Sequence, residues 1–275
     1  IPLTTLVGLS AISSNTHYLK RLGEFVKYRD IIENALNGHG ADYCEIRIEE
    51  TDNSRLTYRG KSLDTIAQTS GLGGNVRAVT KGGWGFASFN SLDELSKKVA
   101  DAVAQSKAVG GTKTELGEVE PHVDVVQAYI VEDPTEISLD EKKRQMDHYN
   151  DLVWSVGGIN SADIIYGDTS RKTFFGSSDG SYIEQQQVHV VSRISAQARS
   201  GGDVQQAGFS LGSQGDYGLI RGLDDQVIDA AKRAVALLDA KPLEGGERTV
   251  VLDPILAGVF VHEAFGHLSE GDNVY

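Results

Sequence analysis

The stretch KTFFGSSDGSYIE at residues 172–184 decides the fold. Two short segments rich in aromatic and β-branched residues flank a connection that contains Asp179-Gly180. An Asp-Gly pair between two such segments is a strong local signal for a β-hairpin, because both residues tolerate the backbone angles of tight turns. The stretch therefore predicts two antiparallel strands that follow one another along the chain.

Alternating and turn-punctuated patterns extend outward from this hairpin over residues 160–217. Upstream, the sequence predicts strands at 43–48, at 55–58 after a turn at Asp52-Asn53, and at 65–67 before a glycine-rich stretch. Helical spacing of apolar residues predicts helices over about 16–37, 91–108, 138–156 and 224–240. The expected class is α+β, with mainly antiparallel sheets flanked by helices.

Helix starts follow from short polar signals. Ser91 with Glu94, and Ser138 with Glu141, have the spacing of capping boxes. Asp224-Asp225 is expected to cap the helix that follows it.

The chain is expected to contain three parts. Residues 1–108 form an α+β subdomain, and residues 109–240 form a second subdomain of antiparallel strands and helices that begins with a glycine-, proline- and acid-rich linker at 109–135. Residues 241–275 begin a carboxy-terminal domain with one strand and one helix.

Composition limits the class of partner. The 26 basic and 39 acidic residues give a net charge of −13, which disfavours nucleic acid and anionic membranes as partners. A single cysteine excludes an intrachain disulfide and suits a reducing compartment, so a cytoplasmic location is expected. The glycine-rich GLGG at 71–74 lacks the spacing of nucleotide-binding loops and precedes a strand pattern, so close strand packing or turns explain it better.

The stretch VHEAFGH at 261–267 holds the candidate site. His262 and His267 flank Glu263 in an HExxxH pattern, which combines the commonest protein ligand for zinc with a carboxylate placed to deprotonate a bound water. Histidines five residues apart lie about 140° apart on a regular α-helix, so they cannot share one ion there. A single π-turn would realign the rings, and Gly266 is expected to ease that distortion. The alternative is a helix with two unrelated polar histidines.

The surroundings of the motif support a helix. Asp253 is the expected N-cap, Pro254 suits the first helical position, and RTVVL at 248–252 is expected to be a buried strand. Ser269, Glu270 and Asp272 follow closely enough to contact a ligating imidazole, although ordinary polarity of an exit loop explains them equally well.

Five stretches together resemble the TldD/PmbA family of metallopeptidases, over most of residues 30–275. The HExxxH pair resembles the TldD-like catalytic branch, because the TldE-like branch lacks it. The segments that carry the resemblance are ADYCEIR at 41–47, GLGGNVRAV at 71–79, GGWGFAS at 82–88, GERTVVLDP at 246–254 and VHEAFGHLSEGD at 261–272.

This resemblance implies a Zn²⁺ site held by His262 and His267 and completed by a cysteine from later in the carboxy-terminal domain. The chain would then be the amino-terminal portion of a longer enzyme, truncated after the motif and inactive or weakly active by itself. Cys44 lies in an alternating apolar segment and is expected to be a buried packing residue rather than a substitute ligand.

The expected function is zinc-dependent hydrolysis of small or unfolded peptides, with Glu263 as general base. The family also implies a homodimer, or a heterodimer with a related TldD/TldE-like subunit. The alternative from a different class is a non-catalytic subunit that serves dimerisation or peptide binding.

Overall fold

The computed structural model describes residues 28–109, 111 and 116–271. The chain separates into two compact units, Ile1–Asp239 and Ala240–Tyr275, and each is described by itself. In the first unit, the described part of the helix expected at 16–37 spans residues 28–36, and residues 16–27 lie outside the described residues. No helix among the described residues is both long and apolar enough to cross a membrane.

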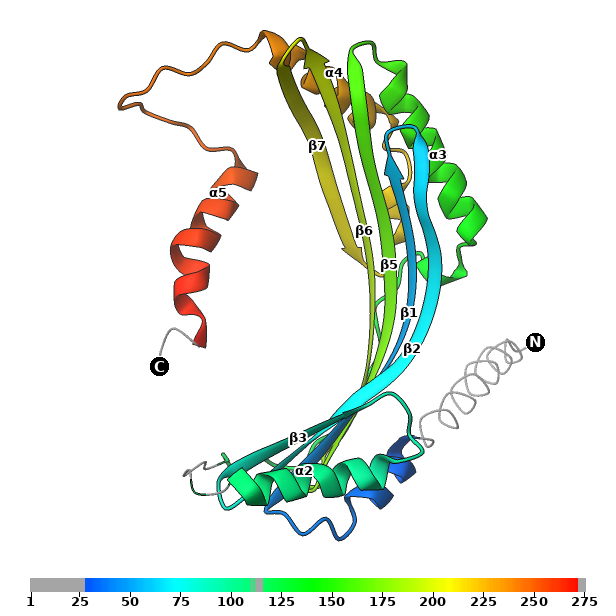
Figure 1. The fold of residues 1–275 in the computed structure, drawn as a ribbon, viewed down its shortest axis with the longest axis vertical. Helices are drawn as coiled ribbons and strands as arrows, with labels where there is room; N and C mark the ends of the chain where they lie inside the picture. Colours follow the sequence, from blue (N-terminus) through cyan, green and yellow to red (C-terminus); the bar gives the residue numbers. More distant parts are fainter. Residues whose placement is uncertain (1–27, 110, 112–115, 272–275) are drawn as a thin grey trace, which may run out of the picture. The chain divides into compact units, whose positions relative to one another are not determined.

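One seven-stranded sheet organises the first unit (Figure 1), in the order β3-β2-β1-β5-β6-β4, with β7 also paired to β6. All neighbouring strands are antiparallel except β4 and β6, so the predicted mainly antiparallel α+β class is confirmed. The strands are β1 Tyr43–Arg59, β2 Ser62–Thr80, β3 Gly83–Phe89, β4 Val123–Val126, β5 Ile159–Ser177, β6 Tyr182–Ser200 and β7 Asp203–Gln214.

The hairpin predicted at Asp179-Gly180 joins β5 to β6. Gly180 has a φ of +91°, and its N–H donates to the carbonyl of Ser177 at 3.1 Å. The two strands pair antiparallel from Gly176 opposite Tyr182 onward. The prediction from the 172–184 stretch is therefore confirmed.

The turn predicted at Asp52-Asn53 is wrong, because β1 runs through both residues without interruption. β1 lies between β2 and β5, so hydrogen bonds on both sides hold it extended. The two turn-prone side chains are also satisfied across the strands: Ser70 donates to Asp52, and the Thr169 hydroxyl donates to Asn53 at 2.8 Å. The chain instead turns at Gly60, where φ is +63°.

Helices cover the sheet at its two ends (Figure 1): α2 Leu95–Val109 and residues 28–36 at one end, and α3 Leu139–Ser155 and α4 Asp224–Ala236 at the other. Each end has its own apolar core. The even-numbered residues of β1 enter both cores, with Ile46 in one and Leu56 in the other. Since alternate side chains of a strand point to opposite faces, both cores lie on the same face of the sheet.

The predicted helix caps have mixed outcomes. Ser138 caps α3, since its hydroxyl accepts the N–H of Glu141 at 3.2 Å. The Ser91–Glu94 box is wrong: Ser91 accepts from the N–H of Asp93, and the helix begins only at Leu95.

The expected acidic cap of α4 is also wrong. The N-cap is Leu223, which makes no side-chain cap, because Asp224 already lies inside the helix. The Asp224 carboxylate instead lies 3.0 Å from Nε2 of His148 on α3, so it joins two helices rather than capping one.

The linker predicted at 109–135 contains a strand. β4 pairs in parallel with the start of β6, from Val123 opposite Tyr182 to Val126 opposite Gln185, so these four residues of the segment are part of the sheet. The sheet also runs across residue 108, since β1 pairs with β5 of the later segment. The three-part division at 108 and 240 stays a prediction.

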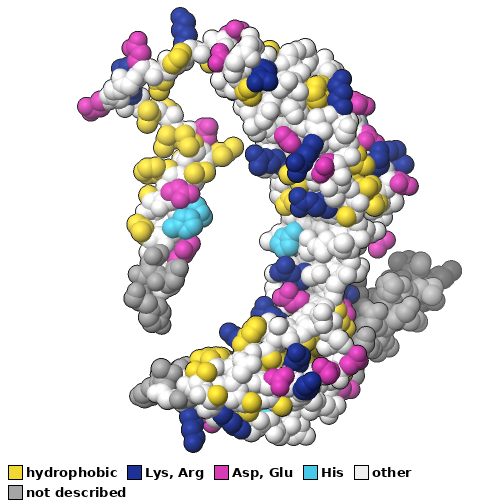
Figure 2. All heavy atoms as spheres, in the orientation of Figure 1, with side chains coloured by type: hydrophobic (Ala, Val, Ile, Leu, Met, Phe, Trp, Pro, Cys, Tyr) yellow, Lys and Arg dark blue, Asp and Glu magenta, His cyan; other side chains and the backbone are white. Residues whose placement is uncertain are grey.

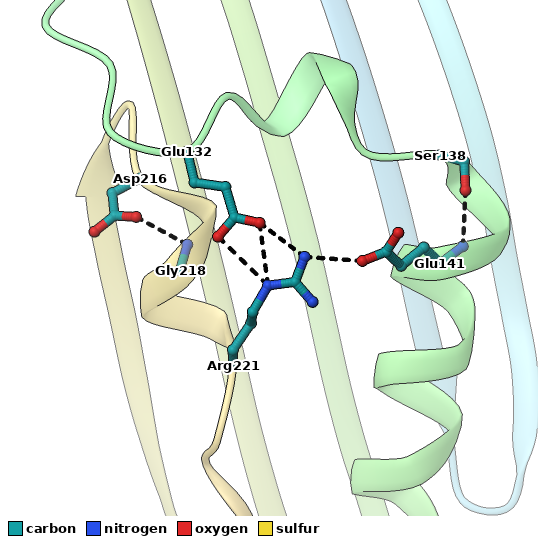
Figure 3. A network of polar contacts seen from close by, with 6 residues as sticks. All are labelled: Glu132, Ser138, Glu141, Asp216, Gly218 and Arg221. Atoms are coloured by element: carbon teal, nitrogen blue, oxygen red, sulfur yellow. Dashed lines mark hydrogen bonds and ion pairs between the residues drawn. The ribbon is translucent and has the colours of Figure 1, made fainter.

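Arg221 joins its own segment to the segment before α3 and to the first turn of α3 (Figure 3). Its guanidinium donates to Glu132 and to Glu141, each at 2.8 Å, and these two carboxylates raise its pKa. Nearby, Asp216 accepts the N–H of Gly218 at 2.9 Å and caps the short 3-10 turn Tyr217–Ile220. The network holds the start of α3 beside this turn.

The GLGG stretch lies inside β2. A Cβ on Gly74 would lie 2.3 Å from the carbonyl oxygen of Arg47 and 2.4 Å from the ring of Phe89, so this glycine permits close packing. Close strand packing is therefore the physical role of this position.

Candidate metal centre

Helix α5, Pro254–Val261, lies in the second unit and directly precedes the histidine pair in the chain. Asp253 is its N-cap, since the carboxylate accepts the N–H of Leu256 at 2.8 Å, and Pro254 occupies the first turn. The predicted helix start is therefore confirmed.

The buried strand predicted at 248–252 is wrong. These residues have no regular secondary structure, and Val251 is 98% exposed. A strand needs a neighbour for its backbone hydrogen bonds, and the described residues of this unit, 240–271, contain no other strand.

A π-helical turn, His262–Gly266, continues α5. The N–H of His267 donates to the carbonyl of His262, which is the i→i+5 bond that the five-residue spacing predicted. The two imidazole centroids lie 4.5 Å apart with their planes at 70°. The turn therefore brings the rings to one side of the helix.

Gly266 does not have the role expected from the sequence. Its φ is −56°, an ordinary helical value, so the π-turn does not need a glycine backbone here. A Cβ at this position would lie 3.4 Å from Nδ1 of His262, in contact with the ring. That distance is an ordinary van der Waals contact, so the position also admits an alanine.

Glu263 completes a compact group of donors. One candidate ligand atom from each of His262, Glu263 and His267 lies within 4.8 Å of the others, and all three residues are exposed. The Glu263 carboxylate lies 3.8 Å from Nε2 of His267. Two imidazoles beside a carboxylate form a donor set that suits zinc and related transition metals, so these residues fit such an ion.

Glu270 orients the second histidine. Its Oε1 lies 2.7 Å from Nδ1 of His267. When Nδ1–H donates to this carboxylate, the lone pair of Nε2 is left available as a ligand. Of the other expected partners, Ser269 donates to the carbonyl of Gly266 at 2.9 Å, and Asp272 lies outside the described residues.

Cys44 belongs to the core of the first unit. It is 0% exposed on β1, and burial raises the pKa of its thiol to about 11. The sequence-based interpretation of Cys44 as a packing residue is confirmed.

Two family models match the chain. The PmbA/TldA metallopeptidase domain 1 matches residues 44–106, and the PmbA/TldA metallopeptidase central domain matches residues 132–238. The chain belongs to the TldD/PmbA family of metallopeptidases. The resemblance inferred from the sequence is confirmed at the level of the family.

Relatives with similar sequences are metalloproteases. A metalloprotease of Synechocystis sp. is 38% identical over 240 residues, covering 86% of this chain and 51% of the relative. A zinc metalloprotease TldD homolog of Saccharolobus solfataricus is 23% identical over 242 residues, covering 85% of this chain and 51% of the relative. The chain thus spans about half the length of the curated relatives it matches.

Solved structures share the fold. A proposed modulator of DNA gyrase from Bacteroides thetaiotaomicron aligns with a TM-score of 0.72 and 16% identity, covering 88% of this chain and 57% of that one. TldE from Thermococcus kodakarensis aligns with a TM-score of 0.60 and 14% identity, covering 74% and 47%. At such identities the likeness shows the fold alone.

Proposed function

We propose that this chain supplies the HExxxH segment of a zinc-dependent peptidase of the TldD-like branch. The observation that carries the proposal is the π-turn, which places the rings of His262 and His267 4.5 Å apart beside Glu263. The name of the Saccharolobus relative, a zinc metalloprotease, supports zinc as the ion.

His262 and His267 would hold the ion, and Glu270 would keep the ring of His267 oriented through Nδ1. Bound zinc supplies Lewis acidity, which polarises a carbonyl and acidifies water. Glu263 would take the proton of the water that attacks the scissile carbonyl and later pass it to the leaving amine. The family resemblance implies that a cysteine, outside the matched half of the relatives, provides the third ligand.

The test of the base uses Glu263→Ala in a protein of the relatives' full length. Hydrolysis of an unstructured peptide should be lost, whereas zinc content, measured by atomic emission, should stay unchanged. Glu247→Ala, another exposed acid of the same unit, is the matched control and should retain activity. Undiminished turnover in Glu263→Ala would remove this residue from its role.

The incomplete ligand set leads to a second expectation. Two imidazole nitrogens fall short of the three protein ligands of catalytic zinc sites, so the 275-residue chain should bind zinc weakly and hydrolyse little. Titration calorimetry checks this. Tight, stoichiometric zinc binding by the chain alone would contradict the need for a third ligand from elsewhere.

A non-catalytic subunit for dimerisation or peptide binding is the second candidate, supported by the shared fold with TldE. The two candidates differ at the histidines. A scaffold subunit would tolerate His262→Ala and His267→Ala without loss of function, whereas a peptidase would not. The peptidase proposal includes three further parts. They are small or unfolded peptides as substrates, a homodimeric or TldD/TldE-like assembly, and a cytoplasmic location.

A further inference from the structure

The sheet of the first unit has a second face, opposite the two cores. On β1 the odd-numbered residues from Arg47 to Arg55 point to this side and are exposed or half-buried. The same alternation holds on β5 and β6, whose even-numbered residues enter the cores. Figure 2 shows Lys and Arg side chains over the strand layer, with Asp and Glu side chains among them and one histidine.

The strand register places three arginines together in the middle of this face. Arg55 on β1 lies opposite Gly167 on β5, Arg193 on β6 lies opposite Ile165, and Arg171 lies opposite Thr51. We call Arg55, Arg171 and Arg193 the arginine face. All three side chains are exposed.

A row here means the residues that pair across the strands with one residue of β1. The four rows through Thr51, Asn53, Arg55 and Thr57 contain no Asp or Glu on this face among the described strands. The chain as a whole has 39 acidic and 26 basic residues, so composition alone does not explain a patch with only positive charges. Acids on this face lie one row beyond each end: Glu49, at 3.9 Å from Arg171, and the exposed Asp163 on β5, opposite Arg59 of β1.

The side chains of Arg55 and Arg193 make no ion pair or hydrogen bond with any described residue. Guanidinium groups are suited to hold carboxylates through two parallel hydrogen bonds, and they are weakly hydrated compared with ammonium groups. Two such groups therefore remain available to a partner with carboxylates.

The spacing of these arginines suits an extended chain. Arg55 and Arg193 are two strands and two residues apart, which puts their Cα atoms about 12 Å apart. Carboxylates four residues apart on an extended peptide are separated by about 13 Å. Gly167 lies between the two arginines and has no side chain to block the path.

We propose that the arginine face binds extended acidic peptide segments, with Arg55 and Arg193 each holding one carboxylate. A peptide fits better than a nucleic acid, because the net charge of −13 repels a polyanion over a long range while two arginines hold two local charges. The inference concerns binding only and does not depend on the metal centre.

The probe is a fluorescein-labelled Gly-Ser peptide with three glutamates at four-residue spacing, and the matched probe has glutamines instead. Fluorescence anisotropy at low salt should show binding of the first and on the order of tenfold weaker binding of the second. Affinity for the glutamate peptide should fall as salt rises from about 50 to about 300 mM.

The double variant Arg55→Gln/Arg193→Gln should lose about tenfold in affinity. The matched control is Arg144→Gln/Lys232→Gln, which removes the same charge from exposed positions on α3 and α4 and should bind like the parent. Arg55→Lys/Arg193→Lys keeps the charge without the bidentate geometry and should lie between the two. Thermal melting followed by circular dichroism establishes that each variant folds.

Four outcomes would overturn the proposal. The glutamate and glutamine peptides would bind alike, or the control would lose as much affinity as the test variant. A single-stranded oligonucleotide of equal length that binds as well, with the same loss in the variant, would indicate a general polyanion surface. Loss of self-association in the variant by sedimentation, with peptide binding retained, would assign the face to a second copy of the chain.

Discussion

Nζ of Lys142 on α3 lies 2.7 Å from a carboxylate oxygen of Asp168 on β5, and both side chains are buried, at 1% and 3% exposure. The Ser54 hydroxyl at 3.1 Å from Nζ, and the Tyr166 hydroxyl, which donates to Asp168 at 2.7 Å, complete the group. A buried charge is tolerated only when paired and hydrogen-bonded, so this pair fixes how α3 sits on the sheet.

Lys142→Ala should lower the free energy of unfolding by roughly 3–5 kcal/mol, because it leaves the Asp168 carboxylate buried without its partner. The control Lys143→Ala removes a partly exposed pair with Asp147 and should cost about 0–1 kcal/mol. Urea denaturation measures both. The double variant Lys142→Met/Asp168→Leu should recover most of the stability. Equal losses for Lys142→Ala and Lys143→Ala would contradict the importance of the buried pair.

Gly74→Ala should destabilise the first unit by about 1–3 kcal/mol or more, since the added Cβ would lie 2.3 Å from the backbone oxygen of Arg47. Gly71→Ala lies on the same strand, where a Cβ meets only the Thr51 hydroxyl at 3.4 Å. Its effect should stay within about 0.5 kcal/mol. A reversed order in thermal melting would show that β2 is packed differently.

Cys44 should be inert to thiol reagents in the folded chain, because burial raises the pKa of its thiol to about 11 from a usual 9.0 and the nearby Glu45 charge adds to this. Reaction with a chromogenic disulfide at pH 8 should be slow until urea is added.

The same shift has a consequence for stability. The folded thiol keeps its proton to higher pH than the unfolded one, so the contribution of Cys44 is complete below about pH 9 and falls as the pH rises toward 11. Cys44→Ala should remove this part of the alkaline dependence. Rapid labelling of the native chain at pH 8 would contradict both statements.

Glu270→Gln should weaken zinc binding about 10- to 100-fold in a protein of the relatives' full length, because a neutral amide supports the imidazole of His267 less strongly than a carboxylate does. Competition with a chromogenic chelator gives the affinity. Glu247→Gln is the matched control of the same charge change and should bind like the parent. Unchanged affinity in Glu270→Gln would show that the 2.7 Å contact does not orient a ligand.

Several errors of the sequence-based analysis share one cause. Asp52-Asn53 has turn chemistry, but β1 is hydrogen-bonded on both sides there. Asp224 has capping chemistry, but it lies inside α4 and contacts His148. In each case a local preference of less than a few kcal/mol was overridden by tertiary contacts that a single-sequence pattern does not contain.

The sequence by itself determined the features that depend on neighbouring residues. The Asp179-Gly180 pair predicted the antiparallel hairpin, and the five-residue interval between His262 and His267 predicted a π-turn if the two rings share one ion, because the rotation per residue of a helix is fixed. Only the tertiary structure decided which distant residues come together, such as Lys142 and Asp168 in an ion pair or Arg55 and Arg193 on one face of the sheet. Strand register and helix packing bring together residues that are far apart in the chain. The spacing of neighbouring residues does not predict such contacts.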